Sequence, residues 1–458
     1  MELQVGFRLR PGEVVAIVGG GGETTLMFRL AEEIVAAGNS VVTTTTTRIF
    51  SAQTGLAPHH LAIENPGSLP RELPALLQVH HHVLITVVPE NESGKAPGIA
   101  PELVVEIKEL VGDSKFNIVV EADGSRMRSL KAPESHEPVI PDCTTLVSPI
   151  VGADIFGERL TDERVHRAHI AADLLGARIG DLVTPDMVSR LLLHPQGGAK
   201  GLPSGARLVP LINKVETQAR LQLARETARV LLRGGVDEVL LGTTASADPV
   251  IERWGRVAVI LLAAGGATRM DEAGEIKQLL PWGRGTLLTR AADGALQSEA
   301  DSVVVVVGCQ SERVEDALEG RDVTVAHNPE WEAGQSGSVR VGLDALKHDV
   351  TGAIFLLVDQ PCVGPELLDA VIRTYRQSGA AIVAPRAGGR HANPVLFDMA
   401  LWADMRQVRG DMGGRELLDL HVNKIACVDW GDEILAEVNT GNDYVVLREN
   451  IAETTAYT

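Results

Sequence analysis

One stretch in the second half of the chain combines a glycine turn with two basic residues at a spacing that suits nucleotide chemistry. Residues 257–278 read VAVILLAAGGATRMDEAGEIKQ. The apolar run is long enough for one buried strand, and the small residues after it would let backbone N–H groups approach phosphate oxygens or a base edge. Arg269 and Lys277 supply the positive charge that a triphosphate and a leaving pyrophosphate require. The predicted nucleotide-binding residues of this loop are Leu262, Ala263, Ala264, Gly265 and Gly266.

A carboxylate follows a second apolar run, AIFLLVDQP, at Asp359. Open sheets of parallel strands bind ligands at the carboxyl ends of their strands, so Asp359 could hold a magnesium ion that bridges phosphates. The alternative is an aspartate that caps the helix after Pro361. Because Asp359 occurs together with the glycine loop at Leu262, we favour the magnesium site.

Four later loops carry polar residues that could face an anionic substrate. GQSGSVRVGL at 334–343 places Ser336 and Arg340 in a Gly/Ser turn that enters a helix, which suits an anion, although a capping turn without a ligand explains it equally well. GGRHANPVLF, GDMGGR and EVNTGNDY are also Gly- or Pro-marked, and each by itself could be ordinary turn chemistry. The polar residues singled out in these three loops are Arg390, Asp411, Arg415 and Asn439.

The first half contains the outline of a phosphate-binding loop, VVAIVGGGGETTLMFRLAEEI. Its predicted residues are Gly19, Gly20, Gly21, Gly22, Thr24 and Thr25, after a strand at Val14–Val18. A working loop of this kind carries lysine where this chain has Glu23, and like charges about 4 Å apart in a partly screened site repel by roughly 4 kcal/mol. A triphosphate would therefore bind poorly unless Glu23 turns away.

Two further segments of the first half fit a nucleotide site. FNIVVEADGSR ends a strand on Glu121 and Asp123, where acids can coordinate magnesium, and INKVE resembles a guanine-reading N-K-x-D arrangement with Glu216 in place of aspartate. Carboxylates at strand ends are common, and NKVE could simply start a helix. Nucleotide binding by this half, and hydrolysis, are left open.

These residues need buried strands to position them, and such strands alternate with amphipathic helices from end to end. Continuous Val/Ile/Leu runs separated by helices, such as those at Thr25–Ala37 and Pro365–Ser378, predict parallel sheets covered on both faces. We predict an α/β fold with two domains, each a mostly parallel sheet with helices on both faces. The segment 245–256 interrupts the pattern, so the predicted domains are residues 1–248 and 255–458.

Composition restricts the partners. The chain has 42 basic and 61 acidic residues and a formal charge of −19, which argues against a nucleic-acid surface. The four cysteines show no C-x-x-C spacing, which favours a reduced compartment over a zinc site or a disulfide framework. No signal peptide and no run of eighteen apolar residues is found, so we expect a cytoplasmic protein with no membrane partner.

The second half resembles the molybdenum cofactor cytidylyltransferases and their guanylyltransferase relatives in the MobA-like nucleotidyltransferase group. Over residues 255–450 the motifs LAAGGATRM, KQLLP, the Gly/Ser turn, DQP, GGRHANPVLF, GDMGGR and EVNTGN follow the family order. The resemblance implies a Rossmann-like domain that transfers CMP from CTP to molybdenum-bearing molybdopterin and releases pyrophosphate, with Mg²⁺. It implies the following roles: Lys277, Arg269 and Asp359 catalytic; Asp359 and, more weakly, Asn439 on the metal; Ser336, Arg340, Arg390, Asp411 and Arg415 on the pterin side.

Base choice and three departures from the family pattern concern the same loops. The guanylyl-transferring relatives resemble LAGG, whereas Ala264 adds a methyl group that could narrow the base pocket, so we expect CTP over GTP. Three extra residues precede Lys277, His391–Asn393 replaces a common Gly-Pro step, and Gly441 replaces the proline of NTP. None of the three removes a charged group, so we expect altered loop geometry more than lost activity.

The first half resembles the accessory (YqeC-like) proteins of selenium-dependent molybdenum hydroxylases over residues 8–248, through VGGGGETTLMFRLA, TTTTTRIF, EADGSRMRSLKAPESHEP, VGADIFGERL and INKVE. The resemblance implies a P-loop-like domain that helps to mature molybdenum enzymes, with hydroxylase apoenzymes or their chaperones as possible partners. It implies site residues Asp123, Ser125, Arg126, Lys131 and His136, and Lys131 could supply the charge missing from the loop. Two alternatives remain: a scaffold that handles the cofactor without turnover, and a nucleotidyltransferase that uses GTP or another phosphorylated acceptor.

Overall fold

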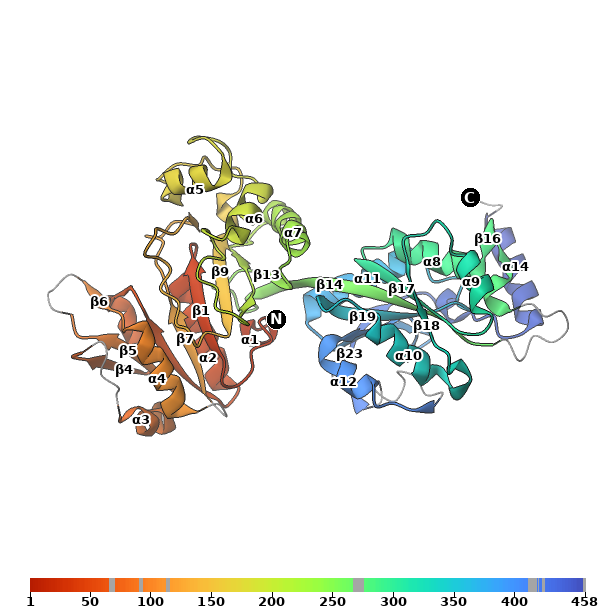
Figure 1. The fold of residues 1–458 in the computed structure, drawn as a ribbon, viewed down its shortest axis with the longest axis horizontal. Helices are drawn as coiled ribbons and strands as arrows, with labels where there is room; N and C mark the ends of the chain where they lie inside the picture. Colours follow the sequence, from red (N-terminus) through yellow and green to blue (C-terminus); the bar gives the residue numbers. More distant parts are fainter. Residues whose placement is uncertain are drawn as a thin grey trace. The chain divides into compact units, whose positions relative to one another are not determined.

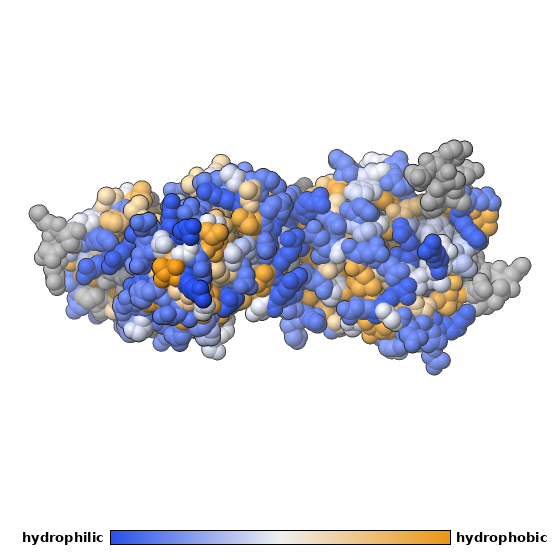
Figure 2. Space-filling model, turned by 90° about the horizontal axis from the view of Figure 1, so that it is seen from above, coloured by the Kyte–Doolittle hydropathy of each residue, from blue (hydrophilic) through white to orange (hydrophobic). Residues whose placement is uncertain are grey.

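The computed structural model describes residues 1–65, 71–89, 94–112, 116–266, 276–410, 418, 420–421 and 425–455. The chain divides into two compact units, Met1–Trp254 and Gly255–Thr458, and each unit is an α/β fold (Figure 1). Hydrophilic residues cover most of the face shown in Figure 2. In the described part of the chain, no helix is long and apolar enough to cross a membrane.

The first unit is built on a parallel sheet. Its strands lie in the order β4 (His59–Ile63), β5 (His82–Val87), β2 (Ser40–Thr45), β7 (Phe116–Glu121), β1 (Val14–Gly19), β9 (Leu146–Gly152), β12 (Leu211–Asn213) and β13 (Glu238–Gly242). Strand β11 (Arg207–Leu208) also pairs with β9, and two small sheets join β3 (Arg48–Phe50) to β6 (Lys95–Pro97) and β8 (Leu130–Lys131) to β10 (Val165–His166). The described helices are α1 (Leu3–Gly6), α2 (Glu23–Ala36), α3 (Leu73–His80), α4 (Pro101–Val111), α5 (Ala168–Leu175), α6 (Pro185–Leu193) and α7 (Gln218–Arg233).

The alternation of side chains along β1 explains why both faces of this sheet are covered. Val15 and Ile17 belong to a buried cluster with apolar residues of α2, whereas Val14 and Ala16 belong to another cluster with residues of α3 and α4. Successive residues of a strand point to opposite faces, so a strand without polar interruptions must be buried on both. The sheet thus has helices on both faces, as predicted from the sequence.

The second unit has a mixed sheet in the order β18 (Thr324–His327), β17 (Ser302–Val307), β14 (Val250–Ala263), β19 (Val350–Leu357), β22 (Val395–Asp398), β20 (Ile382–Ala387) and β23 (Ile425–Asp429). All neighbours are parallel except β22, which runs antiparallel to β19 and β20. Strand β21 (Arg390–His391) pairs antiparallel with β20, and β15 (Pro281–Trp282) and β16 (Gly285–Thr286) form a separate two-stranded sheet. The described helices are α8 (Leu287–Gln297), α9 (Ser311–Asp316), α10 (Gln335–Asp344), α11 (Pro365–Ser378), α12 (Trp402–Met405) and α14 (Gly441–Thr455).

Strand β14 shows the same two-sided burial. Val259 and Leu261 pack in a cluster with residues of α8 and α11, and Ile260 packs in a second cluster with residues of α10. The strand begins at Val250, so residues 250–256, interpreted from the sequence as an interruption of the pattern, form its first part. The expected α/β class with mostly parallel sheets is confirmed.

Candidate functional site

The loop after β14 and the loop after β19 lie at the same edge of the second sheet. The two strands are parallel neighbours, and their register places Leu262 opposite Leu357. Both strands end within one residue of this pair, so the residues that follow them leave the sheet side by side. This geometry brings Asp359 to the glycine loop.

Lys277 and Asp359 form an ion pair at this edge. The Nζ atom of Lys277 lies 2.6 Å from Oδ2 of Asp359, and the two side chains are 23% and 18% exposed. The other carboxylate oxygen of Asp359, Oδ1, is buried and has no hydrogen-bond partner in the described part of the chain. Lys277 can therefore neutralise a phosphate, and Oδ1 of Asp359 can serve as a ligand to a cation.

Gln278 fixes the glycine loop and was not singled out in the sequence. Its buried amide Nε2 donates hydrogen bonds to the carbonyl oxygens of Ala263 at 3.0 Å and of Gly265 at 2.5 Å. These bonds hold the backbone beside Lys277, so residues 277 and 278 act together: one carries the charge and the other shapes the loop. Its position next to the predicted lysine was the available signal.

The small residues of the loop have different reasons to be small. A Cβ on Gly266 would lie 2.8 Å from the Trp331 ring, whereas one on Gly265 would meet nothing within 4 Å. Ala264 is buried in the apolar cluster with Val339, and its carbonyl oxygen accepts a hydrogen bond from the N–H of Cys309. The Ala264 methyl group therefore faces the core, and a steric effect on base choice stays a prediction.

The segment around Asn439 is tied to the loop after β19. The N–H of Val438 donates to the carbonyl oxygen of Asp359 at 2.9 Å, and the Glu437 carboxylate accepts from Gln360 Nε2 and from Asn439 Nδ2, both at 3.1 Å. The unpartnered oxygen of Asp359 is a suitable magnesium ligand, and Asn439, the residue after Val438, stays a predicted second one. Among the described residues no group of three His, Cys, Asp or Glu could hold a metal by itself, so substrate phosphates would complete the coordination.

A cavity of about 420 Å³ opens beside this edge. Leu262 and Arg390 line it, and so do Gln360 and Glu437, which the sequence reasoning did not select. Ser336 is buried on α10, and Arg340 donates a hydrogen bond to the carbonyl oxygen of Val408 at 3.0 Å. Three predicted residues lie outside the described part of the chain: Arg269, Asp411 and Arg415.

In the first unit, the side chain of Glu23 folds back onto its own loop. Its Oε2 accepts a hydrogen bond from the N–H of Gly22 at 3.1 Å, and its Oε1 is buried without a partner in the described structure. Burial, and then the charge of Asp123, raise the pKa of Glu23 above its ordinary value. The carboxyl group thus occupies part of the space that a phosphate would need.

The glycines of this loop are required because it runs against β9. Gly19 and Gly21 have φ values of +102° and +108°, and a Cβ on either would lie 2.5 Å from a backbone atom of β9. A Cβ on Gly20 would lie 2.7 Å from the carbonyl oxygen of Arg128, and one on Gly22 would lie 2.6 Å from the Asn213 amide. This packing accounts for the glycines whether or not a phosphate binds.

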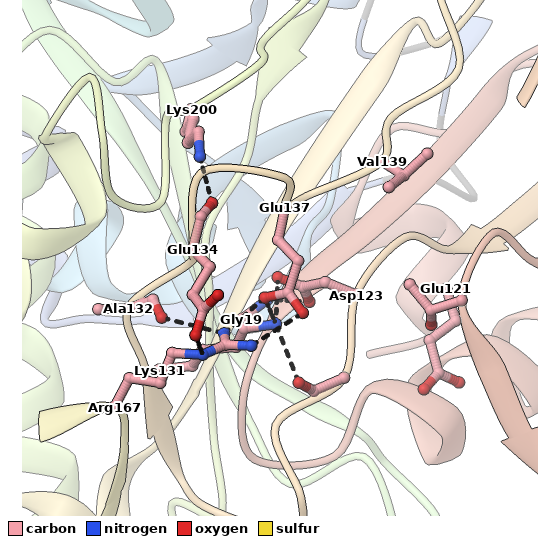
Figure 3. Close-up of polar contacts among 12 residues, drawn as sticks. Gly19, Glu121, Asp123, Lys131, Ala132, Glu134, Glu137, Val139, Arg167 and Lys200 are labelled. Carbon is pink, nitrogen blue, oxygen red and sulfur yellow. Dashed lines mark hydrogen bonds and ion pairs between the residues drawn. The ribbon is translucent and has the colours of Figure 1, made fainter. Parts of the chain in front are cut away.

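Asp123, one of the two acids predicted to hold magnesium in the first unit, is engaged by the protein (Figure 3). Asp123 accepts from the N–H of Gly19 at 2.9 Å through Oδ1, and its Oδ2 lies 3.0 Å from Lys131 Nζ. Lys131, whose side chain is fully buried, also pairs with Glu137 at 2.8 Å, and Arg167 pairs with Glu137 at 2.6 Å. Both carboxylate oxygens of Asp123 therefore have partners, and Lys131 neutralises Asp123 and Glu137 instead of supplying positive charge to the phosphate loop.

The threonines after the glycines also differ. The hydroxyl of Thr24 donates to Glu121 Oε2 at 2.9 Å, whereas Thr25 is exposed. Burial, and then the proximity of Glu23, raise the pKa of Glu121 to about 8. The threonine hydroxyl and the acid that would serve a magnesium ion thus bind each other, and these residues do not fit the metal as arranged.

The polar side chains of the INKVE segment pair with other residues of the protein. Asn213 donates to the carbonyl oxygen of Gly21 at 2.8 Å and accepts from the N–H of Thr244 at 2.9 Å. Lys214 pairs with Asp154 at 3.0 Å, and Glu216 pairs with Arg220 at 3.0 Å. Of the other residues implied here, Ser125 is buried, Arg126 is exposed, and His136 lies 3.6 Å from Glu134.

Comparisons with known proteins match a different family model to each of the two units. The YqeC protein family model matches residues 15–169, and the MobA-like NTP transferase domain model matches residues 259–425. The uncharacterized protein YqeC of Escherichia coli (strain K12) is 32% identical over 168 residues, which are 35% of this chain and 62% of that protein, so the chain spans less than two thirds of this relative.

Two further relatives are covered almost completely. The molybdenum cofactor cytidylyltransferase of Escherichia coli (strain K12) is 25% identical over 196 residues, 42% of this chain and 96% of that protein. The nicotine blue oxidoreductase of Paenarthrobacter nicotinovorans is 29% identical over 185 residues, 39% of this chain and 89% of that protein. The two resemblances inferred from the motifs are confirmed: the chain joins an N-terminal YqeC-family domain to a C-terminal MobA-like NTP transferase domain.

Proposed function

We propose that the second unit is a molybdenum cofactor cytidylyltransferase, which transfers CMP from CTP to molybdenum-bearing molybdopterin and releases pyrophosphate. The observation that carries this proposal is the Lys277–Asp359 pair, 2.6 Å long, at the edge where β14 and β19 end. Nucleotidyl transfer agrees with the MobA-like domain, and the choice of CTP and molybdopterin draws on the cytidylyltransferase relative.

The reaction needs positioning and charge neutralisation more than proton transfer. An ionised phosphate oxygen of the acceptor attacks the α-phosphorus of the nucleotide, and the bond to pyrophosphate breaks, so the number of phosphoanhydride bonds is unchanged. Lys277 would neutralise charge on the triphosphate while Gln278 keeps the glycine loop in place. When bound at Asp359 and Asn439, Mg²⁺ supplies further neutralisation of the phosphates.

Pyrophosphate release by the full chain tests this proposal. The protein is incubated with molybdenum-bearing molybdopterin, Mg²⁺ and CTP, GTP or ATP in separate reactions, and the pterin product is identified by mass. We expect release with CTP that depends on the acceptor. Equal rates with CTP and GTP would refute the preference for cytosine as the base. No pyrophosphate release with any of the three nucleotides would refute the proposed transfer reaction.

For the first unit we propose a role in molybdenum enzyme maturation without nucleotide turnover, with hydroxylase apoenzymes or their chaperones as partners and the cytoplasm as its location. The favouring observation is Glu23, which binds its own loop through Gly22. If the full chain with an inactive second unit, Lys277→Met, still hydrolysed ATP or GTP, this assignment would be wrong.

A further inference from the structure

Gln360 has an orientation that its neighbours fix. The residue is 4% exposed and lines the cavity of about 420 Å³, and its Nε2 donates to Glu437 Oε1 at 3.1 Å. Because a carboxylate only accepts hydrogen bonds, the amide nitrogen must face Glu437 and the amide oxygen must face the other way. This oxygen is buried and has no partner within the described residues.

An unpartnered buried acceptor indicates a missing donor, since nearly all buried polar atoms in folded proteins are paired. Glu437 lines the same cavity, and each of its carboxylate oxygens accepts one hydrogen bond, from the amide of Gln360 or of Asn439. Each oxygen has a further lone pair that can accept another hydrogen bond. Glu437 therefore offers further acceptor sites on this wall, and Gln360, which lines the same cavity, has an amide oxygen that lacks a donor. Apolar side chains of Leu262, Phe355 and Leu357 line the same cavity and suit a flat ring.

We propose that Gln360 and Glu437 bind the acceptor's heterocycle through adjacent N–H donors, as on the 2-amino-4-oxopyrimidine edge of a pterin. This inference rests on the proposed function, since it identifies the part of the acceptor molecule that binds in the cavity. Cytosine, with one amino donor beside two acceptors, matches the wall poorly, so the ring bound here is not the base of CTP. Guanine shares the pterin edge, and the binding experiment separates the two sources.

Binding of three probes to the full chain tests the chemistry without any variant. Pterin, lumazine (which has a 2-oxo group in place of the 2-amino group) and guanosine are titrated in the presence of Mg²⁺ and saturating CTP. We expect pterin to bind at least about tenfold more tightly than lumazine, because lumazine lacks the 2-amino donor and a buried acceptor left unpaired is costly. Guanosine, which shares the donor edge, tests whether the site takes the base of a nucleotide. Equal affinity for pterin and lumazine, or tighter binding of guanosine with displacement of CTP, would overturn the proposal.

A matched pair of variants then assigns the effect to the named carboxylate. Glu437→Gln removes one acceptor, and Glu433→Gln removes an exposed carboxylate of the neighbouring turn η8 (Asp432–Leu435) that does not line the cavity. Glu437→Gln should weaken pterin binding about tenfold and lumazine binding much less. It should also raise the KM for the acceptor more than the KM for CTP. Equal losses in both variants would contradict the assignment.

The two proposals fail in different ways. If pterin is preferred over lumazine but no nucleotide yields pyrophosphate, the cavity reads a pterin and cytidylyl transfer is wrong. If pyrophosphate forms while pterin and lumazine bind equally, the reaction stands and the role of Gln360 and Glu437 is wrong.

Discussion

Replacing Lys277 by methionine should slow catalysis far more than it destabilises the fold. The Lys277–Asp359 pair is 2.6 Å long and partly solvated, and pairs of this kind contribute about 1 kcal/mol or less to stability. Loss of one preorganised charge contact to a transition state costs about 3 kcal/mol, which is roughly 100-fold in rate. Methionine keeps most of the volume of the side chain, so the charge is the main change.

The chain offers a matched control for this substitution. Arg321 pairs with Asp293 at 2.6 Å, with side chains 25% and 44% exposed, and neither residue lines the cavity. Arg321→Met should lower stability by a similar small amount and leave turnover unchanged. The assay compares kcat for pyrophosphate release with the urea midpoint of each variant. A loss of less than about threefold in Lys277→Met, or the same loss in Arg321→Met, would refute the catalytic role.

Three predictions concern the first unit. Lys131→Met should lower the free energy of unfolding by about 3–5 kcal/mol, because Asp123 and Glu137 lose a buried counter-charge. Urea denaturation measures the loss, with Lys108→Met as the control, since Lys108 lies in the last turn of α4, away from this network. Equal losses in the two variants would count against the network. Glu121 keeps its proton up to about pH 8 in the folded protein but loses it near pH 4.5 in the unfolded chain, so its contribution to stability falls as pH rises between these values. The thermal unfolding temperature of Glu121→Gln should therefore depend less on pH than that of wild type. Parallel curves of unfolding temperature against pH would disprove this. Glu23→Lys should bind ATP or GTP at least about tenfold more tightly than wild type by equilibrium dialysis, since the substitution reverses the charge at the loop, and unchanged affinity would show that other groups exclude phosphate.

The sequence predicted the fold class well because burial on both faces leaves a direct trace in the residues. Continuous apolar runs such as Val257–Leu262 can satisfy their side chains only between two layers of helices. The helix at Pro365–Ser378 was predicted with the bounds that the structure shows, since proline starts it and glycine follows it. The strand start at Val250 was missed because Glu252, Arg253 and Arg256 interrupt the apolar pattern.

The candidate site could be predicted only where a motif carries the chemistry. Lys277 and Asp359 were selected separately, and their contact depends on the pairing of β14 with β19, which no local pattern specifies. Gln278, Gln360 and Glu437 lie inside the quoted motifs KQLLP, DQP and EVNTGN but were not selected, because their roles depend on the loop and the cavity that folding brings them to. Asp123 and Lys131 were selected as site residues, but in the structure they pair with each other inside the protein.

The two glycine loops differ in how their charge is balanced without a ligand. At the second loop Lys277 is held by Asp359, whose second oxygen is unpaired, so an incoming phosphate and cation can exchange partners with an existing ion pair at little electrostatic cost. At the first loop Glu23 has a raised pKa, and its carboxyl group already accepts from the loop backbone. Phosphate binding there would have to displace a buried side chain and bring negative charge close to Asp123 and Glu121, both of which are also buried. The two glycine loops therefore lead to opposite expectations, because one has a lysine beside an unpaired carboxylate oxygen, whereas the other has a buried glutamate in place of the lysine.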